Sequence, residues 1–398
     1  MFALQGSRFA CLTYALDGLK KTGVSLVGFN GEAFLPVALA DDKGLFYFVP
    51  KIALFLNISL EHAIDVFFYG VSALSILIGL VGFFLITKST VSRVVLVVGL
   101  SFLAETVIGI GDVYVFHAFS MVATAPWAIY FFNAKKSDLK ILSFYSFCGL
   151  FWSFCHFIRA FSWVSGFIFV FVLLFKSGYI KHNKKFVAML LFAVCFFVPK
   201  LFYKSVFDKS NEFLSQQDCR VDDVEGHCLW HMACCGLGYL DNDYGYRYDD
   251  RIAKNNVYSK YQGVRYGDAS YDQAARKYFF DFVLTKEGFF FYLRTTFAKI
   301  GVLLLYLIAC ANLGLLFALL FRKPFIFDWA FLAMIIFNSL FSILTVPIMP
   351  NVVGVISSSA LFGIYSICFA FDGEKKYKVF KRVRDFLIYA LKCIFLLN

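Results

Sequence analysis

Asp42 and Lys43 are the first neighbouring acidic and basic residues in the chain, and such a pair could do chemistry. They precede Gly44 and an aromatic run within the segment NGEAFLPVALADDKGLFYFVPK, residues 30–51. A carboxylate can accept a proton from an attacking hydroxyl group, and a neighbouring ammonium group can bind an anionic phosphate. The alternative is a solvated turn, because Asp and Gly are ordinary turn residues.

Two further carboxylates stand out against an apolar background. Glu105 lies inside an apolar segment, and Asp112 follows Gly111 at the tip between two such segments. A carboxylate inside a membrane is costly and usually faces a cavity or a partner, so Glu105 is a functional candidate. Asp112 is a second candidate, with a solvated turn as the alternative.

A third group is the densest in chemistry-bearing side chains: HCLWHMACCGLGYLDNDYGYRYDD, residues 227–250. Histidine and carboxylates suit hydroxyl recognition or proton transfer, and Trp and Tyr rings suit the faces of sugars. His231 is the acid–base candidate. The candidates for binding a sugar or an acceptor are Trp230, Tyr239, Tyr246, Asp249 and Asp250. The alternative is a small cap stabilised by turns and aromatic packing.

The cysteines of this polar region allow two interpretations. Four of them crowd the long loop, namely Cys219, Cys228, Cys234 and Cys235. A disulfide among them is expected if the loop faces an oxidising compartment. Cys228, His231, Cys234 and Cys235 also have the spacing of metal ligands, but a second paired half is missing, so we expect no metal there.

The elements that position these residues must belong to a membrane bundle. The chain is 60% hydrophobic and 16% charged, contains 53 Phe residues and has a mean hydropathy of +0.71. A soluble fold of this length cannot bury so much apolar surface. Since backbone groups in lipid must be hydrogen-bonded internally, we expect an all-α polytopic membrane protein. The net charge of +11 does not indicate a nucleic-acid partner, because the basic residues lie mostly between apolar segments.

Nine apolar segments are candidates for membrane spans: 64–86, 94–111, 113–132, 139–157, 160–175, 186–203, 291–321, 325–346 and 353–371. Among the short links, basic residues cluster in alternate ones, at Lys88, Arg93, Lys135, Lys136, Lys140, Lys176, Lys181, Lys184, Lys185, Arg322, Lys323 and, after the last segment, 375–384. The intervening links are poor in basic residues or, like 204–290, too long for the charge rule to apply. The positive-inside rule places the basic links in the cytoplasm. The loop 204–290, with fourteen of the 27 acidic residues, is then extracytoplasmic. This pattern predicts a multi-pass protein of the plasma (inner) membrane.

The expected organisation has five parts. They are an extracytoplasmic first loop (1–62), a six-helix membrane bundle (63–203), an extracytoplasmic loop domain (204–290), a three-helix membrane bundle (291–371) and a basic amphipathic tail on the cytoplasmic surface (372–398). An outer N-terminal segment normally follows a first span or a signal peptide. We therefore expect the natural first helix to be missing, with direct translocation of a short N-terminus as the alternative.

The first 130 residues resemble a known family. Asn30-Gly31, the pair Asp42-Lys43 before aromatic residues, and the segment GDVY at 111–114 are similar to segments of the membrane-embedded GT-C glycosyltransferases. This clan includes the protein mannosyltransferases and the aminoarabinose transferase of lipid A. Family members also carry an acidic pair before the Asn-Gly, followed by Arg and an aromatic residue. Here Arg8 and Phe9 fit that pattern, but the acidic pair is absent.

The resemblance implies an enzyme that moves a sugar from a polyprenyl-phosphate carrier to a glycan, lipid or protein acceptor at the outer membrane face. Asp42 or Asp112, or His231 of the loop, would take the proton of the acceptor. Cations would stabilise the departing lipid phosphate, and the candidates are Lys43, Arg8, Arg294 and Lys299. Interfacial snorkelling is the alternative role of the last two. No cofactor is required by the pattern, and a divalent cation remains open.

Two other functions fit part of the sequence. A secondary transporter needs ionisable residues near the membrane midplane, for which Glu105 is the best-placed candidate. A polysaccharide polymerase or ligase would have a long outer loop with paired arginines, and Arg247 and Arg251 are the nearest such pair.

Overall fold

The computed structural model describes residues 2, 4, 6–37, 42–133, 137–217, 219, 229–320 and 325–372. Within these ranges the chain forms fifteen helices and one two-stranded antiparallel sheet. Eight of these helices are long and apolar enough to cross a membrane. They are α3 (Leu60–Ile86), α4 (Thr90–Gly109), α5 (Val115–Asn133), α6 (Asp138–Ile158), α8 (His182–Gln216), α12 (Lys286–Ala311), α14 (Phe325–Leu344) and α15 (Met349–Asp372). The prediction of an all-α multi-span membrane protein is confirmed.

Two of the nine predicted spans differ from the expected helices. The segment 160–175 begins with a turn, in which Phe161 has a φ of +64°, and only then forms α7 (Val164–Lys176). Its 13 residues extend about 20 Å, less than the roughly 30 Å of a hydrocarbon core. The segment 291–321 is interrupted at Asn312, where φ is +34°, and continues as α13 (Leu313–Leu320). Apolar composition alone does not show either break.

Side-chain caps fix where several helices begin. Ser59 accepts a hydrogen bond from the backbone N–H of His62 at the start of α3, and Ser89 does the same for Ser92 at the start of α4. Thr285 caps α12 in this way. These caps pair backbone donors that have no partner within the helix.

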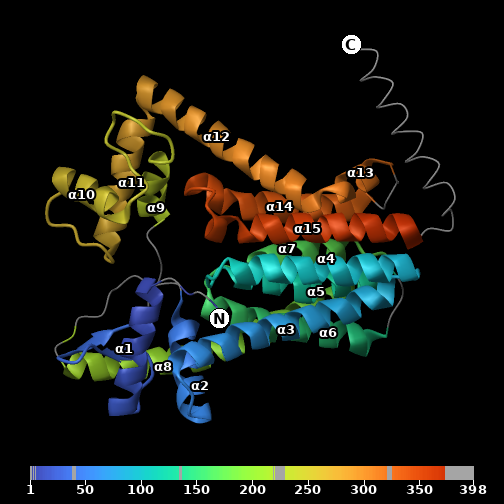
Figure 1. Cartoon of the computed structure of the whole chain (residues 1–398), viewed down its shortest axis with the longest axis horizontal. Helices are drawn as coiled ribbons and strands as arrows, with labels where there is room; N and C mark the ends of the chain where they lie inside the picture. Colours follow the sequence, from blue (N-terminus) through green and yellow to red (C-terminus); the bar gives the residue numbers. More distant parts are fainter. Residues whose placement is uncertain are drawn as a thin grey trace.

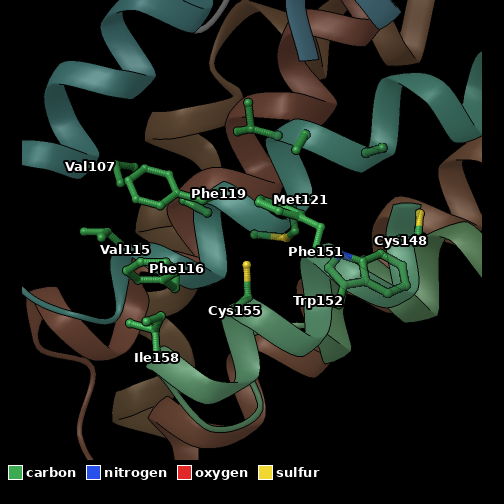
Figure 2. Packing of buried hydrophobic residues seen from close by; sticks show 14 of the residues in the cluster. Val107, Val115, Phe116, Phe119, Met121, Cys148, Phe151, Trp152, Cys155 and Ile158 are labelled. Atoms are coloured by element: carbon green, nitrogen blue, oxygen red, sulfur yellow. The ribbon is translucent and has the colours of Figure 1, made fainter. Parts of the chain in front are cut away.

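Aromatic and small side chains fill the centre of the bundle (Figure 2). Phe116 and Phe119 of α5 face Trp152 and Cys155 of α6 in this cluster, all of them buried. Nε1 of Trp152 donates to the carbonyl of Ser120, 3.4 Å away. Cys155 is fully buried among these side chains and packs as a small hydrophobic residue.

Helix α15 packs against α4, α5, α12, α13 and α14, and most of its residues are buried. Small residues permit close contact: a Cβ on Gly363 would lie 2.6 Å from the carbonyl oxygen of Ala311. Near its C-terminus, Oγ of Ser92 donates to the carbonyl of Cys368 at 3.1 Å and to Oδ1 of Asp372 at 2.8 Å. Small residues and interhelical hydrogen bonds are the usual means of packing helices in lipid.

The remaining elements gather at one end of the bundle, at the left of Figure 1. They are α1 (Gly6–Thr22), β1 (Val27–Phe29), β2 (Phe34–Pro36), α2 (Lys43–Leu56), α9 (Leu229–Leu237), α10 (Asp250–Lys260) and α11 (Ala269–Val283). We call this the polar end. The link between α3 and α4, with Lys88, lies at the opposite end of the bundle (Figure 1). The expected tail at 372–398 falls, from 373 onward, outside the described residues.

Candidate functional site at the polar end

Arg8, Asp42 and Asp112 meet in one buried ion cluster at the polar end. Nε of Arg8 donates to Oδ2 of Asp42 at 2.7 Å, and Nη1 donates to Oδ2 of Asp112 at 3.1 Å. Arg159 completes the cluster, because its Nη1 donates to Oδ1 of Asp42 at 3.0 Å. Three residues predicted from distant parts of the sequence are thus in direct contact.

The ion cluster is almost completely shielded from water. Asp42 and Asp112 are each 1% exposed, Arg159 is 3% exposed and Arg8 is 8% exposed. Buried charges of this kind must be paired, since an isolated ion would carry a large desolvation cost. Two carboxylates and two guanidinium groups provide matched charges.

Helix ends place all four charged groups. Arg8 lies in the first turn of α1, Asp42 directly precedes α2, and Arg159 directly follows α6. Asp112 lies in the link between α4 and α5, where Oδ1 accepts the backbone N–H of Tyr114 at 3.3 Å. The cluster therefore joins α1 to the start of α2, to the end of α6 and to the link between α4 and α5.

The two carboxylates of the ion cluster have different environments. Asp42 is held by both Arg8 and Arg159, whereas Asp112 pairs with Arg8. Burial raises the pKa of Asp112 above that of an ordinary carboxyl group, against the opposing effect of Arg8. A raised pKa moves a carboxylate toward the range in which it can act as a base near neutral pH.

Tyr114 covers one side of the ion cluster. The guanidinium carbon of Arg159 lies 4.0 Å from the centroid of the Tyr114 ring, a cation–π contact. Burial raises the pKa of Tyr114, so this hydroxyl stays neutral. The GDVY segment thus supplies a carboxylate and an aromatic cover from adjacent positions.

A cavity of about 700 Å³ opens beside the ion cluster, between the start of α2, the end of α6 and the polar end of α8. Its charged and polar lining is mainly basic and comes from Lys43, His156, Lys200, Lys204, Asp208 and Asn211. Nζ of Lys43 lies 4.4 Å from the centroid of the Phe207 ring. We call this space the Lys43 cavity.

The rest of the Lys43 cavity is apolar and continues onto the lipid-facing surface of the bundle. Phe161, Phe197 and Leu201 line it and are 66%, 58% and 70% exposed. Helix α8 has 35 residues and so extends about 52 Å, longer than a hydrocarbon core of roughly 30 Å. Its second half carries two of the lysines of the cavity, Lys200 and Lys204.

The ion cluster and the Lys43 cavity share their backbone. Asp42 and Lys43 are consecutive, and Arg159 lies between the cavity residues Phe157 and Ala160. The side chains of Asp42 and Asp112 are not part of the cavity lining. A ligand in the cavity would therefore contact Lys43 and Ala160, the sequence neighbours of Asp42 and Arg159.

No protein-family model, curated protein sequence or solved structure matches this chain.

Two predicted phosphate-binding residues lie away from the Lys43 cavity, on α12. Arg294 is exposed. Lys299 is buried, and its Nζ donates to the carbonyl of Ile343 at the end of α14, 3.0 Å away. Its ammonium group also lies 5.9 Å from the ring centroid of Tyr239. Lys299 and Tyr239 thus help to join the loop domain to the bundle.

Several sugar-binding candidates of the loop have packing or capping roles. Trp230 packs against Phe279 and Phe280, with ring centroids 5.7 and 5.1 Å away. Tyr246 is 4% exposed and lies in the core of the loop domain. Asp249 caps α10 by accepting the N–H groups of Arg251 and Ile252. These three contacts are the turn and packing roles that the sequence predicts as the alternative to sugar binding.

His231 and Asp250 form a separate cluster in the loop domain. Nε2 of His231 lies 3.2 Å from Oδ1 of Asp250, and Nδ1 lies 2.8 Å from the hydroxyl of Tyr271. The hydrogen bond from His231 lowers the pKa of Asp250. Cys219, Cys234 and Cys235 are free thiols, and Cys228 lies outside the described residues.

Three residues of the site were missed from the sequence. Arg159 lies in a short link between two predicted spans, and a single basic residue there does not determine the orientation of the spans. Lys200 and Lys204 fall at the end of a predicted span and read as ordinary flanking charges. Their spacing of four along α8 places both on one helix face, which was a usable signal.

Proposed function

We propose that this protein is a membrane glycosyltransferase that moves a sugar from a polyprenyl-phosphate donor to an acceptor at the extracytoplasmic face of the plasma (inner) membrane. The observation that carries the proposal is the junction of Asp42 and Lys43, because it joins a buried carboxylate cluster to a basic, lipid-facing cavity. Both features lie at the polar end, away from the basic link at Lys88.

The Lys43 cavity suits the donor's phosphate. Lys43, Lys200 and Lys204 supply cations, while Phe197 and Leu201 offer an apolar path from the lipid-facing surface. An amphiphile with an anionic head group and an isoprenoid chain matches this combination. Charge developing on the departing lipid phosphate would be stabilised by the same lysines.

Asp112 is the better candidate for the base. A base needs a carboxylate whose pKa is raised toward neutrality, and burial raises that of Asp112. Asp42, held by two arginines, is better suited to position Arg8 and Arg159. Reaction would require the ion cluster to open toward the Lys43 cavity, whose lining includes Lys43 next to Asp42 and Ala160 next to Arg159.

The experiment is a transfer assay in proteoliposomes that contain the full chain and short-chain polyprenyl-phosphate hexoses. Asp112→Asn should lower sugar transfer about 10²–10⁴-fold while donor binding stays near wild type. Glu105→Gln is the matched control, because Glu105 is exposed on α4 and lies outside the ion cluster. Full transfer by Asp112→Asn, or loss of activity only in Glu105→Gln, would overturn the proposal.

A further inference from the structure

His231, Cys235 and Asp250 turn their donor atoms toward one another in the loop domain. Nε2 of His231 lies 3.2 Å from Oδ1 of Asp250, and Sγ of Cys235 lies 3.6 Å from each of these atoms. Nitrogen, sulfur and oxygen thus form a small triangle of three different metal-binding atoms.

The size of this triangle matches one face of a tetrahedral zinc site. Zinc bonds of about 2.0 Å to nitrogen or oxygen and about 2.3 Å to sulfur, at tetrahedral angles, separate N from O by about 3.3 Å and S from either by about 3.5 Å. All three observed distances agree with these values to within about 0.1 Å. A cation could therefore enter without rearrangement of the three side chains.

Local structure fixes each of the three side chains. His231 and Cys235 are four residues apart on α9, so they share one helix face. Asp250 is the first residue of α10, whose start is set by the Asp249 cap. Nδ1 of His231 is held by the Tyr271 hydroxyl at 2.8 Å, which leaves Nε2 directed at the triangle. Such a partner on the second ring nitrogen is typical of metal-binding histidines.

The triangle is closed on one side and open on the other. His231 and Cys235 are buried, whereas the side chain of Asp250 is 72% exposed. A cavity of about 370 Å³ lies there, lined by Tyr248, Asp249, Asp250 and Arg251. Three protein ligands with one accessible position are the pattern of zinc sites that bind water or a ligand oxygen.

We propose that His231, Cys235 and Asp250 bind one zinc-class divalent cation, with the fourth position open to water or to an oxygen-bearing ligand. The proposal does not depend on the glycosyltransferase assignment. It differs from the spacing noted in the sequence, because Sγ of Cys234 is directed to the carbonyl of Ala275. Asp250, fifteen residues after Cys235, supplies the third ligand atom in place of Cys234.

The test uses the full chain, purified in detergent without chelator. After dialysis against trace zinc, elemental analysis should find one zinc per chain, and addition of Co²⁺ to the apo-protein should give a thiolate-to-cobalt charge-transfer band. Cys235→Ser and His231→Gln should lose the bound metal, and Tyr271→Phe should weaken binding about 10–100-fold. Cys234→Ser is the matched control and should bind as wild type does.

The cobalt band of the unaltered chain keeps the test independent of whether the ligand variants fold. Absence of zinc above background, or of a charge-transfer band, would overturn the proposal. Equal loss of metal in Cys234→Ser and Cys235→Ser would do so as well, because it would show that metal binding does not select the sulfur of the triangle.

Discussion

Nη1 of Arg8 lies 3.1 Å from Oδ2 of Asp112, although 104 residues separate them in the chain. The same guanidinium group also binds Asp42 at 2.7 Å. One side chain therefore ties the N-terminal helix to the link between α4 and α5 and to the start of α2. The site depends on this contact for its shape.

Removal of one arginine should strongly destabilise the protein. Arg159→Met leaves Asp42 buried with less compensating charge, and loss of one partner of a buried ion pair costs about 3–5 kcal/mol. Thermal unfolding in detergent should show a large decrease in Tm. Arg294→Met, at an exposed position of α12, should change stability by less than about 0.5 kcal/mol. Equal effects of the two changes would contradict the buried cluster.

Neutralising both Asp42 and Arg159 should lower the free energy of unfolding by less than the sum of the two single changes. Asp42→Asn removes the charge that Arg159→Met leaves uncompensated, so the double variant should recover part of the lost stability. A strictly additive pair would show that Asp42 and Arg159 do not interact.

Binding of a lipid phosphate should depend on the Lys43 cavity. Lys43→Ala should weaken binding of a short polyprenyl-phosphate analogue by about 1.5–3 kcal/mol, the range for a charge-assisted hydrogen bond. Lys200→Ala should act in the same direction. Lys140→Ala, in the first turn of α6 at the opposite end, serves as the control and should have no effect. Equal small effects at all three positions would rule out a phosphate site.

Asp112 should make stability depend on pH in a defined direction. Its pKa is raised above 3.8 by burial, so the folded state binds the proton more tightly than the unfolded chain. The resulting stabilisation is complete below that unfolded value and is lost as the pH rises through the folded pKa. Asp112→Asn resembles the protonated form, so it should gain stability relative to wild type as the pH rises from about 4 to about 8. Thermal unfolding of both proteins measures this difference, and a decrease would contradict the raised pKa.

Topology can be tested with single cysteines at exposed positions. Asp243→Cys, in the loop domain, should react with a membrane-impermeant maleimide in intact cells. Ser137→Cys, just before α6, should react only after permeabilisation. The unaltered chain measures labelling of the native cysteines. The reverse pattern would place the ion cluster and the Lys43 cavity in the cytoplasm.

The sequence predicted the membrane bundle and named three of the four residues of the ion cluster as site candidates, for physical reasons that can be stated. Long apolar helices must span lipid, and alternate basic links sort their ends, so Asp42 and Asp112 were expected at one face. Their direct connection through Arg8 was not predictable by spacing, because it depends on how α1 docks. Arg159 was missed because its partner lies 117 residues away.

The loop domain was harder to interpret because chemically versatile residues also have structural uses. Tyr246 and Trp230 suit a sugar, yet the structure places them in packing contacts. Glu105 appeared suited to an intramembrane cavity, yet it is exposed on α4. Whether such a side chain is buried or exposed depends on how its helix is rotated about its own axis. Composition does not determine this rotation for a largely apolar segment.

The central position of α15 has a consequence for how the protein is made. Helices enter the membrane in order during synthesis, so α4 and α5 are inserted long before their last neighbour exists. Until α15 arrives, Ser92 cannot make its contacts with Cys368 and Asp372. During synthesis the faces of α4 and α5 that α15 covers therefore remain without that partner until residues 349–372 have been inserted.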